Sequence, residues 1–384
     1  MSPLYDLIVV GGGSAGSAVA RATAQAGLGT VLLEKGSLDD AGAGWVNGVH
    51  GRSFDEAGVA RPEAPERRAT RPLAGITEHG PHHFHLVAGW GPDRLSFTDT
   101  GVLEVDMRLL NRRLRKDAAE AGAELRSNTR VISLDDRKNG ALKTSRGDLR
   151  ARVIVDATGL GGFFRPDKPR PADICAAAQG VYRVQDRGAA YAWFESQRAT
   201  PGDTVCFASV AGGYSIVSAR LEEGEAGPEL SVLTGSLPAL GHPSGLALRN
   251  AFVASHAFIG PMLFGGQAPI PLHRPRLRLA FTAGSTTVVR VGDAAGLVYA
   301  AHGSGIGAQL IAARMLAEDL STHGPSGAFR FQGRWHRRFL AEFVAADTFR
   351  RLSAKLDGRT LGFLMRRGLM PKALVARGFL AGLV

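Results

Sequence analysis

The chain has 384 residues, of which 45% are hydrophobic and 50 are glycine. This length suits one large or two medium domains with a full-sized core, and the glycine content favours an α/β protein with many tight turns. The two cysteines, Cys175 and Cys206, exclude a disulfide framework. Neither they nor the histidines have the spacing of a zinc site, so we expect no metal.

The net charge of +11 is unevenly placed. Residues 328–384 contain twelve Lys or Arg against three acidic residues. This excess favours contact with phosphate, nucleic acid or an anionic membrane face, and a solvated helical surface explains it equally well. The N-terminus has no basic region before its apolar run, and no apolar run reaches the ~18 residues of a membrane span, so we expect a cytoplasmic protein.

The first predicted elements form a βαβ unit. "YDLIVV" (5–10) is a buried-strand pattern, "SAVARATAQAG" (17–27) is a helix and "TVLLEK" (30–35) is a second strand. A parallel sheet is therefore expected. The next residues, 36–100, are rich in Gly, Ala, Pro and charge, and we predict an irregular excursion there.

The whole chain divides into four predicted parts. A helix over 106–125 and two strands, the second in "ARVIVDATGLGG" (151–162), complete the first part. Short aromatic or β-branched segments after residue 173 suggest a mostly antiparallel sheet. The boundaries that we predict are 1–172, 173–275 for the inserted sheet domain, 276–327 for a return to the first domain, and 328–384 for a helical tail.

The glycines of the βαβ unit fit a dinucleotide-binding loop. Gly11 permits a tight turn, Gly13 lets the backbone approach a pyrophosphate, and Gly16 lets the helix pack closely on the strand. The helix N-terminus then stabilises phosphate charge. Glu34 ends the second strand, where a carboxylate accepts hydrogen bonds from ribose hydroxyls and disfavours a 2′-phosphate.

A second glycine-rich stretch, "VVRVGDAAGLVYAAHGSGIG" (288–307), also lies between a predicted strand and a predicted helix. Gly292 and Asp293 follow the strand. If the ligand is a flavin nucleotide, Asp293 could bind the hydroxyls of its ribityl chain. Gly303, Gly305 and the helix that follows would place N–H groups near the flavin N1 and C2 carbonyl, where negative charge collects on reduction.

Together, "GGGSAG", Glu34, "DATG" (156–159) and "VGDAAG…HGSGIG" resemble the FAD-dependent oxidoreductases of the para-hydroxybenzoate hydroxylase fold, and among them the geranylgeranyl reductase group. "PIPLHRP" (269–275) and the basic, Trp-containing tail strengthen this resemblance. It implies a Rossmann-like FAD domain of the GR2 type with an inserted β-sheet substrate domain and a helical tail. The cofactor contacts that it implies, beside those above, are Ser14, Ala15, Lys35, Asn47, Arg108, Val131, Gly159 and Ile306.

The chain also departs from the group. Met107 stands where an Arg is usual, with Arg108 next to it, and the early excursion has no cysteine. Trp45, Asn47 and Arg52 lie where the excursion should cross the isoalloxazine. No second GxGxxG unit with an acidic residue is present, so NAD(P)H or another electron donor would dock transiently.

The resemblance favours reduction of a C=C bond in an apolar, isoprenoid-like small molecule by hydride from flavin N5. Flavin monooxygenation of an apolar substrate is the alternative, and a non-redox, FAD-dependent cyclisation is a second one. Tyr214 and His302 are the candidate proton donors. Trp335, Phe339 and Phe343 follow helical spacing among arginines, which suits a helix lying on a membrane or one capping the core. We expect no nucleic-acid partner, because the tail has no stacking platform.

Overall fold

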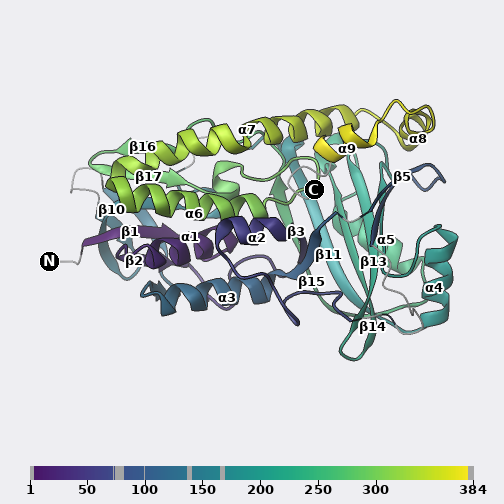
Figure 1. Ribbon diagram of the computed structural model, residues 1–384, viewed down its shortest axis with the longest axis horizontal. Helices are drawn as coiled ribbons and strands as arrows, with labels where there is room; N and C mark the ends of the chain where they lie inside the picture. Colours follow the sequence, from purple (N-terminus) through teal and green to yellow (C-terminus); the bar gives the residue numbers. More distant parts are fainter. Residues whose placement is uncertain are drawn as a thin grey trace.

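A computed structural model describes residues 4–71, 73, 82–98, 100–135, 141–164 and 169–378. The described residues form two large sheets at opposite ends of an elongated molecule, and four long helices cover the first sheet (Figure 1). A two-stranded sheet of β3 (Val46–His50) and β6 (Val102–Asp106) lies between them.

The first sheet has eight strands and is mainly parallel. Its main path is β16 (Ala280–Ala283), β17 (Thr286–Arg290), β10 (Gly147–Asp156), β1 (Leu4–Val10), β2 (Thr30–Leu33) and β7 (Glu124–Arg126). Outside this path, β9 (Ala141–Thr144) pairs with β10, and β8 (Val131–Asp135) pairs with β9. Strand β1 buries Leu7 and Val9 in one apolar cluster and Ile8 and Val10 in another. A continuous apolar run therefore forms this strand, because both of its faces are covered.

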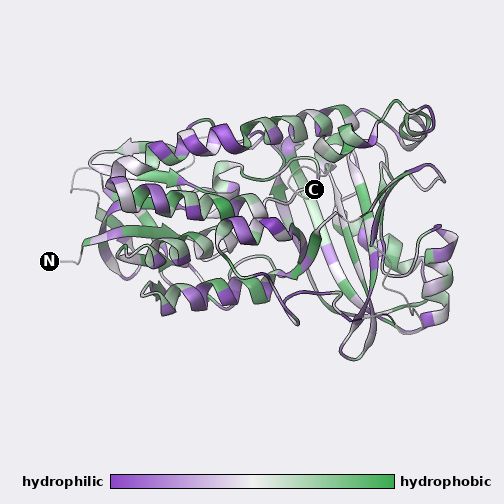
Figure 2. Cartoon of the chain, viewed as in Figure 1, coloured by the Kyte–Doolittle hydropathy of each residue, from purple (hydrophilic) through white to green (hydrophobic). Residues whose placement is uncertain are grey.

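Helices α1 (Ser14–Gln25), α3 (Met107–Glu120), α6 (Ile306–His323) and α7 (Gly327–Ser353) form the layer on this sheet. Helix α1 packs between α3 and α6, and α7 packs on α6. In Figure 2 the central strands are hydrophobic, whereas α3, α6 and α7 alternate between hydrophobic and hydrophilic residues, as expected for helices with one buried face.

The second sheet has seven strands. In sheet order they are β15 (Ile259–Pro271), β11 (Ile174–Val184), β14 (Gly227–Ser236), β13 (Ser215–Gly224), β12 (Thr204–Ala208), β4 (His83–Ala88) and β5 (Arg94–Thr98). All neighbours are antiparallel except β12 and β4. Helices α4 (Arg187–Ser196) and α5 (Gly245–Ala254) contribute Phe194 and Phe252 to its core.

The prediction of an irregular excursion over 36–100 was wrong in part. This region contains β3, α2 (Gly51–Ala57), β4 and β5, and the last two belong to the second sheet. Strand β4 pairs with β12, more than a hundred residues further along the chain. A short strand that depends on so distant a partner has little local signature.

The tail continues through α8 (Gly358–Arg366) and α9 (Lys372–Gly378). Trp335, Phe339 and Phe343 are buried against the rest of the protein, so this aromatic face caps the core and is not available to a membrane. Among the described helices, none combines the length and the apolar character needed to cross a bilayer.

A buried ion cluster fixes α7 to the junction of the two sheets. Asp347 is fully buried and accepts hydrogen bonds from Arg274, Arg350 and Arg351, at 2.8, 3.1 and 2.8 Å. Arg350 also donates to Asp173, just before β11, at 3.0 Å. Burial alone would raise the pKa of Asp347, but the three arginines outweigh it and the pKa lies below its usual value.

Candidate functional site

The carboxyl ends of three neighbouring parallel strands meet at one edge of the first sheet. Val10 at the end of β1 pairs with Asp156 of β10, which pairs with Arg290 of β17. The N–H of Ala157 donates to the Val10 carbonyl at 2.9 Å, and that of Val291 to the Asp156 carbonyl at 3.0 Å. Three loops therefore leave the sheet side by side, at the edge where open α/β sheets bind ligands.

The three glycines of the first loop differ in why a side chain is absent at each position. Gly11 has φ +108°, and a Cβ on it would lie 2.4 Å from the carbonyl oxygen of Ala157. A Cβ on Gly16 would lie 1.9 Å from the Gly11 oxygen. A Cβ on Gly13 would meet nothing closer than Gly42 Cα, at 3.8 Å. The fold itself thus requires Gly11 and Gly16, whereas Gly13 leaves open space in front of α1.

That open space faces an uncapped helix end. Gly13 is the N-cap of α1 and supplies no side-chain hydrogen bond, so the first-turn N–H groups, including those of Ser14 and Ala15, are free to bind an anion. Gly292 has φ +59°, and a Cβ on it would lie 2.8 Å from Ala15 Cβ. The loop of residues 292–295 is therefore packed directly against the start of α1.

Glu34 lies at the same edge, immediately after β2. Its Oε2 accepts a hydrogen bond from the Gly12 N–H at 2.8 Å, and its Oε1 accepts one from the Gly36 N–H at 3.1 Å. The exposed Lys35 follows it. Val131 begins β8, and the nearby Thr129 N–H donates to the Glu34 carbonyl at 2.7 Å.

Two side chains of α3 that the sequence reasoning missed reach this loop. Asn111 is fully buried, and neither polar atom of its amide has a hydrogen-bond partner among the residues that the structure describes. A Cβ on Gly42 would lie 2.2 Å from Asn111 Nδ2, and Gly42 borders the open space at Gly13. Arg115 donates to the carbonyls of Gly12 and Ala41, at 3.0 and 3.2 Å. An amide without partners at the mouth of an anion-binding loop is what a bound pyrophosphate would satisfy.

Arg108, the predicted cofactor contact on α3, is directed elsewhere. Its backbone N–H and its Nε both donate to Asp106 Oδ1 at 3.0 Å, and its guanidinium lies 3.7 Å from the ring centroid of Phe264 on β15. It therefore ties α3 to the second sheet. A polar residue at 111, on the face that Leu110 and Leu114 bury, was the signal available in the sequence.

The start of α6 is a second uncapped helix end. Gly305 is the N-cap and makes no side-chain hydrogen bond, and a Cβ on it would lie 2.0 Å from the Leu297 carbonyl oxygen. Gly303 has φ +76°, and Ile306 is buried. Asp293 is half-buried in the short helix η4 (Gly292–Ala295), which packs against η1 (Gly159–Gly161). Glycine and free N–H groups thus line this side too.

A cavity of about 170 Å³ lies between the second sheet, β3 and the loop before α6. His302 and Ser304 of that loop line it, as does Asn47 of β3. The sheet supplies a mixed lining of apolar and polar side chains: Phe84, Gln179, Thr204, Cys206, Ile216, Ser218, Arg220, Glu222, Ser231 and Leu233.

The polar side chains of this cavity are mutually bonded. Arg220 donates to Glu104 at 3.2 Å, and both are mostly buried. Gln179 accepts from the Val46 N–H at 2.6 Å and donates to Ser231 at 3.1 Å. None of these residues was singled out from the sequence, because strands far apart in the chain bring them together.

The two candidate proton donors line different cavities. The Ser304 N–H donates to His302 Nδ1 at 3.2 Å, so a neutral His302 carries its proton on Nε2. Tyr214 lines a smaller, mainly apolar cavity of about 30 Å³ together with Phe349, Leu361 and Met370. Burial raises the pKa of Tyr214 well above its usual value, so this hydroxyl stays protonated.

Trp45 lies just before β3 in the chain, and Arg52 lies just after it. The Trp45 ring packs near Gly266 of β15, 3.4 Å from where a Cβ would lie. Arg52 lines a groove with Tyr299 and Phe339, outside the cavity of His302. Four histidines lie close together in the sequence, in "HGPHHFH" (79–85). His79 is outside the described residues, and the described part of the chain holds no group of three possible metal ligands.

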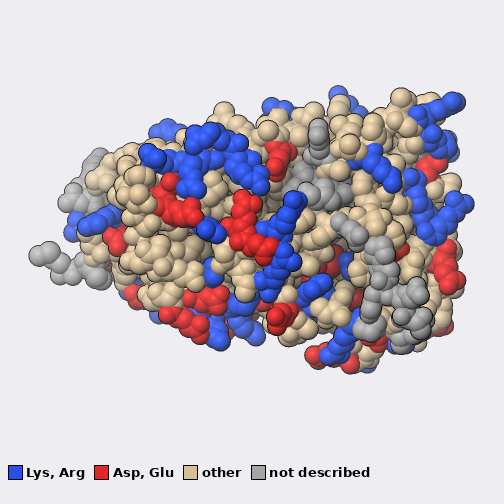
Figure 3. Space-filling view, viewed as in Figure 1, with Lys and Arg blue, Asp and Glu red and all other residues tan. Residues whose placement is uncertain are grey.

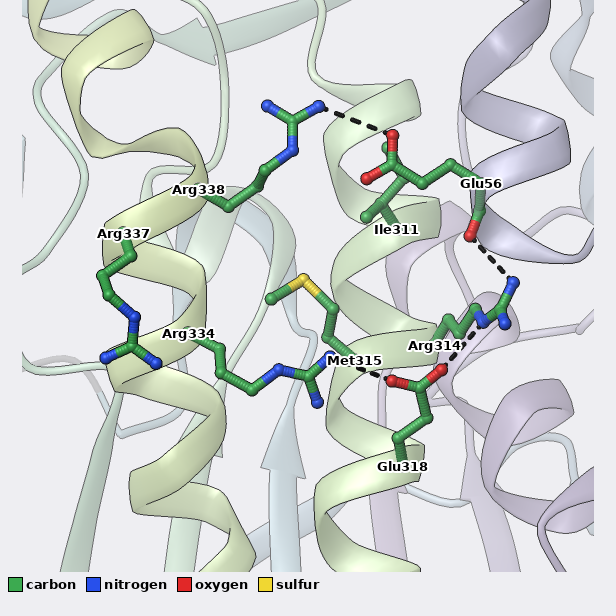
Figure 4. A pocket seen from close by; sticks show the side chains of 8 residues that line it. All are labelled: Glu56, Ile311, Arg314, Met315, Glu318, Arg334, Arg337 and Arg338. Carbon is green, nitrogen blue, oxygen red and sulfur yellow. Dashed lines mark hydrogen bonds and ion pairs between the residues drawn. The ribbon is translucent and has the colours of Figure 1, made fainter.

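A surface groove between α2, α6 and α7 holds four arginines (Figure 4). Arg314 and Arg334 both donate to Glu318, at 2.9 and 3.0 Å, and Arg338 donates to Glu56 at 3.4 Å. Arg334 also pairs with Asp319, and Arg338 with Glu342. The acidic side chains balance the arginines, so this groove is an ion-pair network joining three helices.

Residues 6–165 match the family description "FAD dependent oxidoreductase". The resemblance and the fold class predicted from the sequence are thereby confirmed: residues 6–165 are similar to FAD-dependent oxidoreductases, and the chain, an enzyme, has the architecture of the para-hydroxybenzoate hydroxylase fold.

The similar proteins include reductases and a monooxygenase, and one solved structure is a Diels-Alderase. Digeranylgeranylglycerophospholipid reductase of Sulfolobus acidocaldarius is 23% identical over 94% of this chain and 80% of the relative. One such reductase of Methanopyrus kandleri is 25% identical over 92% of both. The geranylgeranyl bacteriochlorophyll reductase-like protein of Thermoplasma acidophilum has a TM-score of 0.76 at 16% identity, over 100% of this chain and 98% of that one. PqsL of Pseudomonas aeruginosa, solved with 2-aminobenzoylacetate, has a TM-score of 0.63 at 15% identity, over 95% and 100%.

Proposed function

We propose that this enzyme reduces a C=C bond of an apolar, isoprenoid-like small molecule with FAD as its cofactor. One observation carries the cofactor part: two uncapped, glycine-lined helix ends, α1 and α6, meet at one sheet edge beside the unpartnered amide of Asn111. The names of the reductase relatives, which cover nearly the whole chain, support the choice of reaction and substrate class.

The residues at the edge suit the parts of FAD in order. The N–H groups of Ser14, Ala15 and Gly16 would bind the pyrophosphate together with Asn111. Glu34 would turn from the Gly12 N–H to the ribose hydroxyls, and Lys35 and Val131 lie beside it at the adenosine end. Further residues lie at the ribityl and ring end: Asn47, Gly159, Gly292, Asp293, Gly303, Gly305 and Ile306.

When bound, the flavin supplies hydride to one carbon of the double bond. The N-terminal N–H groups of α6 would stabilise the negative charge that a bound flavin gains on reduction. His302 would deliver a proton to the other carbon of the double bond, because its Nε2 carries the proton and its side chain lines the cavity beside the loop before α6. Tyr214, the other candidate proton donor, lies in the separate cavity, whose volume of about 30 Å³ leaves no room for a substrate tail, so we assign the proton transfer to His302. A transiently docked NAD(P)H, or another donor, would restore the reduced state.

The experiment is an anaerobic turnover. The purified enzyme is reduced with dithionite and mixed with geranylgeraniol while flavin absorbance is followed. We expect the flavin to reoxidise without oxygen and the product to be two mass units heavier. No reoxidation with any isoprenoid alkene would contradict the proposal. Repeating the reduction with NADPH and with NADH identifies the donor.

Monooxygenation is the second candidate, and the cavity favours it in one respect. About 170 Å³ is below the usual 300–1,000 Å³ of ligand pockets, and the Glu104–Arg220 pair is polar. A compact, polar substrate would suit this lining better than a long hydrocarbon. Reoxidation that requires oxygen, with a product sixteen mass units heavier, would establish this alternative.

A further inference from the structure

The second half of the helical tail exposes apolar side chains. Twelve large hydrophobic residues of the described chain are exposed, and four of them lie between residues 352 and 374. They are Leu352, Phe363, Leu369 and Leu374, which expose 61, 46, 60 and 55% of their surface. Such a concentration on one segment marks an interaction surface more than scattered single residues do.

Helix α8 shows how this surface is built. Leu361 and Met365, four residues apart, are buried and define its inner face. Phe363 lies two residues from each, so it points to the opposite side. Arg359 and Arg367 flank it there, and the Arg367 guanidinium lies 5.6 Å from the centroid of the Phe363 ring. The outer face therefore carries an aromatic ring between cationic side chains.

The charge on this segment is not balanced as it is in the groove of Figure 4. Between residues 351 and 374 there are six Lys or Arg and one acidic residue, Asp357, which caps α8. Lys355, Arg359 and Lys372 form no ion pair within the described residues. Figure 3 shows Lys and Arg at the end of the molecule that α8 occupies, and over α6 and α7 it shows a blue patch bordered by red.

The inner side of the same segment leads toward the second sheet. Leu361 and Met370 line the small apolar cavity with Tyr214 and Ile216, and Ile216 also lines the cavity of His302. The turn between β4 and β5 touches α8, since Arg366 pairs with Asp93. Trp90 of that turn is 58% exposed.

We propose that this surface docks the enzyme on an anionic lipid bilayer. It consists of Leu352, Phe363, Leu369 and Leu374 with Lys355, Arg359, Arg367 and Lys372. Exposed apolar side chains among unpaired cations match the headgroup region of such a bilayer, where apolar groups insert and cations meet lipid phosphate. The proposed function supplies only the reason for docking, an isoprenoid-like substrate that would pass from the bilayer beneath α8.

The test measures binding of the full-length, FAD-loaded protein to sedimented vesicles of phosphatidylcholine, with and without 30% phosphatidylglycerol. We expect clear binding only with the anionic lipid. Phe363→Ser with Leu369→Ser, and separately Arg359→Glu with Arg367→Glu, should each weaken binding about tenfold or more. The matched controls, Leu240→Ser and Arg337→Glu, lie on other surfaces and should bind like the wild type.

Folding is checked in each variant by flavin content and melting temperature. If one pair of substitutions unfolds the protein, the other pair still tests whether this surface binds the vesicles. Failure of the wild type to bind anionic vesicles would overturn the proposal, as would unchanged binding in both variants. Binding needs no turnover, so a protein that binds vesicles but reduces no alkene would contradict the proposed function and leave the docking surface intact.

Discussion

At the edge of the first sheet, three loops present backbone N–H groups and almost no side chains. In the cavity on the second sheet, side chains from many strands form the surface and bond to one another. Backbone groups cannot be exchanged by substitution and can only be obstructed. A cavity of side chains can be altered one residue at a time. We therefore expect changes at the edge to act on the cofactor and changes in the cavity to act on the substrate.

The largest effect should come from Gly16→Ala. The new Cβ would lie 1.9 Å from the Gly11 carbonyl oxygen, and neither backbone can move without separating α1 from β1. We expect a loss of about 3 kcal/mol or more in the free energy of unfolding and a colourless protein. Thermal unfolding and flavin absorbance measure both. Gly44→Ala is the control, since a Cβ there meets nothing within 4 Å; a stable, yellow Gly16→Ala variant would be evidence against this packing.

Gly13→Val separates binding from folding. The residue has φ −70°, and its Cβ would meet only Gly42 Cα at 3.8 Å, so the protein without cofactor should fold nearly as before. The valine would occupy the space in front of the free N–H groups of α1. We expect FAD to bind at least a hundredfold more weakly with little change in melting temperature of the cofactor-free protein. If the variant retains as much FAD as the wild type, this loop does not bind the cofactor.

Asn111→Leu should have opposite effects on the two forms of the protein. Removing a buried amide without partners should stabilise the cofactor-free form by about 1 kcal/mol, because the leucine has no polar group to desolvate. The same change removes a donor to the pyrophosphate and should weaken FAD binding about tenfold. Fluorescence titration and melting of the cofactor-free protein measure the two quantities. Asn250→Leu, on the exposed side of α5, is the control; a loss of stability in the cofactor-free Asn111 variant would show that the amide has a structural partner.

The residues changed in these variants differ in how well the sequence predicts them. The loop glycines, Glu34 and the start of α6 were predictable because each depends on residues adjacent in the chain and on one strand–turn–helix pattern. Asn111 was missed because its role depends on α3 crossing above Gly42. The cavity was missed for a similar reason: Gln179, Arg220 and Glu104 meet only after β11, β13 and β6 have been brought together. The placing of Tyr214 and His302 in separate cavities likewise depends on the tail, which closes over Tyr214 alone.

The smallest effect on the cofactor should come from the cavity itself. Arg220→Met leaves Glu104 without its partner in a mostly buried place, whereas Arg220→Met with Glu104→Gln removes both charges. We expect flavin content to be unchanged in both and the KM for substrate to change at least fivefold. The direction of the change distinguishes the two candidate functions. If the double variant binds an isoprenoid alkene more tightly, the apolar chain lies against the position of the pair, and reduction of an isoprenoid-like substrate is favoured. If it loses affinity for every substrate, the pair recognises a polar group of the substrate, which favours the compact, polar substrate of the second candidate function.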